Sequence, residues 1–86
     1  MLYEQVMAIF IELDPAQLLA QGYPPVEYDP EVDDFANLLG KKKALTPKQV
    51  YDVLEKWFGP GSEQFIPAER HVQLADRLNA LLTKAP

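Results

Sequence analysis

Apolar residues recur along the 86-residue chain at the spacing of an α-helix, with partners three, four and seven positions apart. Such a spacing puts the apolar side chains on one face, so each stretch predicts an amphipathic helix. Four main helices are predicted, over residues 2–13, 30–39, 47–58 and 67–83. The expected inward-facing residues are Leu2, Val6, Ile9, Phe10, Leu13, Val32, Phe35, Ala36, Leu39, Val50, Val53, Leu54, Trp57, Phe58, Leu74, Ala75, Leu78, Leu81 and Leu82.

Residues that typically begin or end helices mark the boundaries of these stretches. A capping side chain followed by proline is expected to open three helices, at Asp14-Pro15, Asp29-Pro30 and Thr46-Pro47. Glycines, which adopt left-handed backbone easily, are expected to end three helices, at Gly22, Gly40 and Gly59. These signals predict a short fifth helix over residues 15–21. Residues 23–26 are expected to be extended, because proline disfavours helical geometry in the residue before it. Residues 62–66 are expected to form a loose turn.

The predicted fold is therefore all-α: a compact bundle of four main helices plus one short helix, in a single domain over residues 1–86. A chain of this length buries roughly 60–65% of its unfolded surface. Hydrophobic residues make up 48% of the sequence, which is enough for one core. No stretch alternates apolar and polar residues for long enough to predict a strand.

Composition narrows the function classes. The net charge of −5 argues against a nucleic-acid-binding protein, because such proteins neutralise phosphates with basic surfaces. The absence of cysteine excludes disulfides, thiolate metal sites and a cysteine nucleophile, and it favours a reducing compartment. No apolar run approaches the ~18–20 residues that span a bilayer. We therefore expect a cytoplasmic protein that binds neither nucleic acid nor membrane.

The segment from Gly22 to Asp34 is the most distinctive part of the sequence, and it is acidic. Hard cations bind several carboxylate oxygens, so one hypothesis is a metal- or ligand-binding site. The spacing departs from a calcium loop, because Pro30 stiffens the second position and Asp34 replaces the required glycine. Acids also gather in first helical turns because the helix dipole favours them there. The carboxylates concerned are Glu27, Asp29, Glu31, Asp33 and Asp34.

Tyr23 and Tyr28 lie beside these acids on a proline-rich segment. Tyrosine is enriched at protein interfaces, so this pair suggests a recognition surface. The alternative is that both rings pack across helix ends, with their hydroxyls hydrogen-bonded to backbone or water.

The remaining chemistry-bearing residues indicate no enzyme and no cofactor. His71 is the only histidine, and no nucleophile or substrate anchor is identifiable for it. Lys41, Lys42 and Lys43 are placed to offset the dipole at a helix C-terminus. Trp57 lies at helical spacing with other apolar residues, which predicts core packing rather than a ligand site.

The order of these features resembles the YugE-like family of small bacterial helical proteins, a domain of unknown function. The resemblance rests on an opening apolar helix, the Asp14-Pro15 turn and the segment from Gly22 to Val32. Within that segment Pro25, Glu27 and Glu31 match the family, together with Tyr28 and Asp29, whereas Val26 stands where an acid is often found. The resemblance implies an all-helical fold and a bacterial cytosolic origin, with no catalytic residues to transfer.

We therefore predict a non-enzymatic protein-interaction module whose partner is a basic protein; an acidic inhibitor or immunity-type partner of a toxin is one version. The alternative is a small metal- or ligand-binding domain that uses the carboxylates from Glu27 to Asp34. Homodimerisation is a further alternative, because the first helix is apolar on more than one face. The predicted contact residues are Tyr23, Glu27, Tyr28, Asp29, Glu31, Asp33 and Asp34.

Overall fold

The computed structural model describes residues 2–61, 64 and 66–83. Within them the chain forms four α-helices, namely α1 (Leu2–Leu13), α2 (Asp29–Gly40), α3 (Pro47–Phe58) and α4 (Ala68–Thr83), with one 3-10 turn, η1 (Pro25–Tyr28), before α2. The described residues contain no strand, so the fold is all-α as predicted. The loose turn expected over residues 62–66 lies largely outside the described residues.

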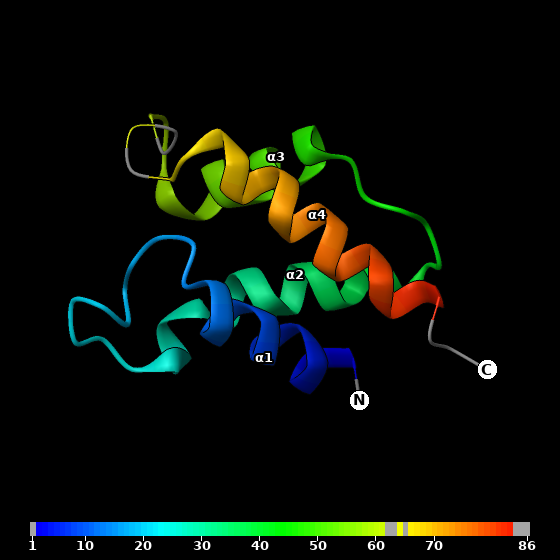
Figure 1. Cartoon of the computed structure of the whole chain (residues 1–86), viewed down its shortest axis with the longest axis horizontal. Coiled ribbons are helices and arrows are strands. Elements are labelled where there is room, and N and C mark those ends of the chain that lie inside the picture. The colour runs from blue at the N-terminus through cyan, green and yellow to red at the C-terminus, as the bar shows by residue number, and fades with distance from the viewer. Residues whose placement is uncertain (1, 62–63, 65, 84–86) are drawn as a thin grey trace.

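The helices form two antiparallel pairs that pack against each other (Figure 1). The first pair is α1 with α2, and the second is α3 with α4. Contacts between α1 and α4 and between α2 and α3 join the pairs. The connection from α1 to η1 projects at one end of the molecule, in light blue in Figure 1.

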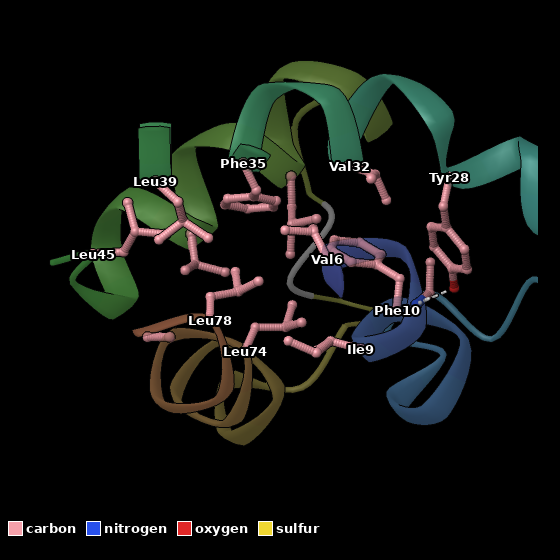
Figure 2. Packing of buried hydrophobic residues seen from close by; sticks show 14 of the residues in the cluster. Val6, Ile9, Phe10, Tyr28, Val32, Phe35, Leu39, Leu45, Leu74 and Leu78 are labelled. Atoms are coloured by element: carbon pink, nitrogen blue, oxygen red, sulfur yellow. Dashed lines mark hydrogen bonds between the residues drawn. The ribbon is translucent and has the colours of Figure 1, made fainter. Parts of the chain in front are cut away.

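One hydrophobic cluster fills the space between the pairs (Figure 2). The ring of Phe10 on α1 meets that of Tyr28 edge to face at 5.1 Å between centroids, and that of Phe35 at 5.8 Å. Tilted and edge-to-face contacts of this kind are favoured by the ring quadrupoles. The buried apolar residues of the helices and η1 are Val6, Ile9, Phe10, Tyr28, Val32, Phe35, Leu39, Val50, Leu54, Leu74, Ala75 and Leu78.

The start of α3 follows its predicted signal. The Thr46 hydroxyl accepts a hydrogen bond from the Gln49 amide at 3.2 Å, and the Gln49 side chain accepts one from the Thr46 amide at 2.9 Å. This reciprocal capping box satisfies two amides that a helix N-terminus leaves without partners. Gly59 follows the helix with φ +89°, in agreement with its predicted role as a terminator.

A side chain of α4 holds the linker between α2 and α3. Asn79 accepts a hydrogen bond from the Leu45 amide at 2.7 Å and donates one to the Leu45 carbonyl at 2.8 Å. Leu45 itself is buried in the core although it lies outside any helix. The linker is thereby attached to the second helix pair through one residue.

The short helix predicted over residues 15–21 is wrong. Asp14 and Gln17 adopt positive φ angles of 43° and 58°, which breaks a right-handed helix before it can begin. Residues 18–22 instead make one turn, closed by hydrogen bonds from the Gly22 amide to the Leu19 carbonyl and from the Tyr23 amide to the Leu18 carbonyl. With Gly22 at φ +94°, this is the termination pattern that the glycine predicted, without the helix.

The short helical element lies instead at Pro25–Tyr28, partly in a segment that was predicted to be extended. The restriction from proline acts on the preceding residue, and Pro24 is indeed extended, with φ −75° and ψ 157°. Pro25 then occupies the first position of η1, where the missing amide hydrogen costs nothing. Helix α2 follows directly with Tyr28 at its N-cap, so the predicted side-chain cap at Asp29 is also wrong.

Two further predictions on α2 and α3 need correction. Gly40 is the last residue of α2, but the left-handed residue that follows the helix is Lys42, with φ +59°. Trp57, expected in the core, keeps 44% of its surface exposed. It lies in the last turn of α3, where its indole N–H bonds to a carboxylate on α2 instead of being buried.

Candidate functional site

The structure separates the seven residues predicted to form a contact surface. Tyr28 and Glu31 are buried, so they are not part of an exposed surface. Asp34 is partly buried and belongs to a different cluster, between α2 and α3. The exposed members are Tyr23, Glu27, Asp29 and Asp33.

Tyr28 is a structural residue whose hydroxyl holds the turn after α1. The hydroxyl donates to the Asp14 carboxylate at 2.6 Å and accepts from the Ala16 amide at 3.0 Å. The same carboxylate accepts hydrogen bonds from the Leu19 and Ala20 amides, both at 3.0 Å. The ring points into the core beside Phe10 in Figure 2. The Asp14 side chain therefore binds the Leu19 and Ala20 amides, which in a helix over residues 15–21 would have bonded to backbone carbonyls.

The electrostatics of this pair keep the tyrosine neutral and the aspartate charged. Burial, together with the hydrogen bond to Asp14, raises the pKa of the Tyr28 hydroxyl well above the ordinary value for tyrosine. Burial acts on the Asp14 carboxyl in the opposite sense to its hydrogen bonds, and the bonds from Tyr28 and from the Leu19 and Ala20 amides prevail, so its pKa is lowered. A charge-assisted hydrogen bond of this kind is stronger than a neutral one.

Glu31 is a buried acid in the first turn of α2, with only 3% of its surface exposed. Its Oε2 atom has no hydrogen-bond partner in the described part of the chain. Burial raises the pKa of this carboxyl to about 7, and repulsion from Asp34, Asp29 and Glu27 adds to the effect. Burial disfavours the charged form because water no longer solvates it. The Glu31 carboxyl therefore keeps its proton to a higher pH than an ordinary glutamate does.

The four exposed members of the predicted site, together with the exposed Val26, make up what we call the acidic loop surface: Tyr23, Val26, Glu27, Asp29 and Asp33. Tyr23 and Val26 expose 51% and 63% of their surfaces, on a stretch stiffened by two prolines. Among the described residues the three carboxylates have no ion-pair partner, and Asp29 and Asp33 lie one helical turn apart. Val26 was not predicted to take part, because the sequence does not show which residue of the loop faces outward.

The same carboxylates do not converge on a cation site. Within the described residues, which include all of the segment from Glu27 to Asp34, no three metal-ligating side chains come together. A hard cation such as Ca²⁺ needs several oxygen ligands at 2.3–2.6 Å. The metal-binding alternative therefore has no support from the geometry of this segment.

A second cluster, which the sequence did not predict, joins α2 to α3. One oxygen of Asp34 accepts from the Trp57 indole N–H at 2.7 Å and from the Lys56 ammonium at 3.1 Å. The ammonium also lies 4.9 Å from the centre of the Trp57 ring, within range of a cation–π interaction. Asp34 thus fixes an exposed aromatic ring and a cation at the boundary of the two helices.

Beside this cluster runs an open groove of about 380 Å³ between α2 and α3. Leu38 and Val53 provide its apolar residues. The polar residues that line it are Asp34, Asn37, Lys41, Asp52 and Lys56. Because the lining comes from two different helices, α2 and α3, no motif within either helix could have predicted it.

His71 does not line this groove. It is buried on α4, with its ring edge to face with that of Tyr51 at 5.5 Å and 82°.

None of the described helices combines the length and the apolarity needed to cross a membrane.

Comparisons with family models, with curated proteins and with solved structures found no match to this chain. The resemblance to the YugE-like family therefore stays a prediction, based on the Asp14-Pro15 turn and the segment from Gly22 to Val32.

Proposed function

We propose that this chain is a non-enzymatic protein-interaction module and that the acidic loop surface contacts a basic partner protein. The observation that carries the proposal is the exposure of Tyr23 and Val26 on a stiff loop, flanked by carboxylates that have no ion-pair partner among the described residues. Large exposed apolar side chains next to a polar rim are characteristic of interaction sites. A loop that is already ordered also loses little conformational entropy on binding.

The acids and the apolar residues would have different tasks. Glu27, Asp29 and Asp33 would attract a basic partner and orient it during encounter, an effect that weakens as salt rises. Tyr23 and Val26 would provide the contact area that slows dissociation. Tyr28 would act indirectly, because its bond to Asp14 holds the base of the loop.

Inhibition of a basic toxin by an immunity-type partner is one form of this function. A bacterial cytoplasmic setting and membership of the YugE-like family belong to the same proposal, on the strength of the sequence resemblance. The acidic net charge of −5 supports a basic partner.

A site-specific crosslinking experiment tests the proposal. A photoreactive phenylalanine analogue is introduced at position 26, or at the similarly exposed position 72 on α4 as a control, in cells of the organism that encodes the chain. We expect a specific crosslinked protein at position 26 and none at position 72. The crosslinked protein is then purified, and its affinity for the unmodified chain is measured by calorimetry at about 50 and 300 mM salt.

Charge variants decide whether the surface acts as proposed. Reversal of two acids in the variant E27K/D29K should weaken binding at least tenfold at low salt, and binding to the unmodified chain should weaken as salt rises. The control D76K reverses an exposed acid on α4 and should bind like the unmodified chain. If E27K/D29K binds normally and the affinity does not depend on salt, the proposal is wrong.

A further inference from the structure

We propose that the groove between α2 and α3 is a second docking site, which binds an acidic amphipathic helix of a partner protein. This site goes beyond the acidic loop surface, because it lies on other residues and selects the opposite charge. Three features carry the inference: the apolar residues in the groove, the excess of positive charge on its lining, and the Trp57 ring, which is fixed against two of the lining residues, Asp34 and Lys56.

The groove has enough room for a few side chains from one face of a helix. A volume of about 380 Å³ accommodates a few apolar side chains. Leu38 and Val53 face it from the two helices, while Lys41 and Asp52 on its rims are exposed. An open groove with apolar residues inside and long polar side chains on the rim suits a helix laid along it better than an enclosed small molecule.

Positive charge is in excess on the lining of the groove, because its two carboxylates are already paired. Asp34 is neutralised by Lys56, with its oxygen 3.1 Å from the ammonium, and Asp52 is paired with Lys48 at 3.4 Å. Lys41 also lines the groove but has no ion pair within the described part of the chain.

Lys42 and Lys43 follow Lys41 and are also exposed. The C-terminal dipole of α2 is equivalent to about half a negative charge, which these three lysines exceed several times. The C-terminal end of α2, from which Lys41 lines the groove, is therefore positive, and it complements carboxylates on the occupant.

Trp57 does not itself line the groove, but it is held against two residues that do, Asp34 and Lys56. Its ring is 44% exposed, and the hydrogen bond to Asp34 together with the stacked Lys56 holds it in place. Exposed tryptophans in fixed positions are frequent anchors of protein interfaces. Asp34 therefore serves to position the ring, which explains why this large apolar residue lies outside the core.

The experiment uses Trp57 as its own reporter, because it is the only tryptophan in the chain. The probe is a synthetic helical peptide that carries leucines on one face and glutamates elsewhere, with no aromatic residue. A matched peptide with lysine in place of every glutamate is the control. We expect the leucine–glutamate peptide to shift Trp57 emission to shorter wavelength and to saturate, whereas the leucine–lysine peptide causes no saturable shift.

Two variants of the full chain locate the binding. K41E reverses an exposed charge at the groove, and V53S removes apolar surface inside it; we expect each to weaken peptide binding at least tenfold. The matched charge reversal R70E on α4 should leave the affinity unchanged. Thermal unfolding followed by circular dichroism verifies that each variant is folded, and K41E tests the proposal even if V53S does not fold.

The outcomes separate this inference from the proposed function. No saturable shift, equal shifts with both peptides, or affinity unchanged in K41E would overturn the second docking site and leave the acidic loop surface untouched. A shift that depends on the concentration of the chain without any peptide, with a larger species in sedimentation, would instead identify a second copy as the occupant. That result would also overturn the assignment to an acidic partner.

Discussion

At the scale of single residues, the Tyr28 hydroxyl connects the core to the turn after α1. It is fully buried, donates to Asp14 and accepts from the Ala16 amide. Y28F keeps the ring but leaves that buried amide without its acceptor, so we expect a loss of about 1–3 kcal/mol in the free energy of unfolding. Chemical denaturation measures it, with Y23F as the control at an exposed position. An equal effect of both changes would contradict this role.

Glu31 makes the stability depend on pH. Its folded-state pKa of about 7 is higher than the ordinary value of 4.5, so the folded state retains the proton more readily than the unfolded state. The resulting stabilisation is fully present below pH 4.5 and is lost as pH rises through about 7.

E31Q removes the titrating group but keeps its shape. We expect this variant to be more stable than the unmodified chain at pH 8, by at most about 3 kcal/mol, and the advantage to shrink toward pH 5. Unfolding measured across this pH range tests the expectation, with exposed Glu27→Gln as the control. A stability difference that is independent of pH would show that the Glu31 carboxyl does not titrate in this way.

At the scale of secondary-structure elements, each helix boundary depends on where its backbone amides find acceptors. At α3 the acceptor is local, since Thr46 and Gln49 satisfy each other's amides. T46A should cost about 1 kcal/mol, the usual effect of removing an N-cap side chain. Lys48→Ala, in the first turn of the same helix and exposed, should change the unfolding free energy much less. No loss in T46A would mean that water replaces the cap.

The predictions from sequence succeed and fail at this scale for the same reason. The capping box needs only residues three positions apart, so the sequence shows it directly. The turn over residues 15–21 depends on Tyr28, a residue from beyond the loop, whose hydroxyl takes the Ala16 amide. Propensity and capping rules describe neighbours in sequence, and they do not include a hydroxyl brought in by tertiary packing.

At the scale of the whole molecule, the two helix pairs share one core. Phe35 on α2 is fully buried and packs against Phe10 on α1. F35A should cost about 3–5 kcal/mol, which is a large part of the ~5–15 kcal/mol that stabilises a domain. Removing the partly exposed Ile11 side chain, in I11A, should cost far less.

The same variant tests whether the pairs unfold together. Circular dichroism reports all helices, whereas Trp57 fluorescence reports the contact between α2 and α3. If one core joins the pairs, both signals in F35A should show unfolding at the same denaturant concentration. That concentration should be lower than for the unmodified chain. Separate transitions would show that the pairs are independently stable.

The residues predicted to form the contact surface also divide into those that the structure exposes and those that it buries. Tyr23, Glu27, Asp29 and Asp33 were predicted and are exposed as a contact surface requires. Tyr28 and Glu31 were predicted on the same grounds, but they are buried. Composition identifies acids and aromatics, whereas burial depends on which way each residue faces once the helices have packed.

The sequence by itself determined the four helices, the capping box at Thr46 and the termination at Gly22, because each follows from periodicity or from residues a few positions apart. Only the tertiary structure decided that Tyr28 holds the turn after α1 and that Glu31 is buried. It also decided that Trp57 and Asp34 meet beside a groove, which is the basis of the proposed second docking site. Those outcomes depend on contacts between segments distant in the chain, which local patterns do not encode.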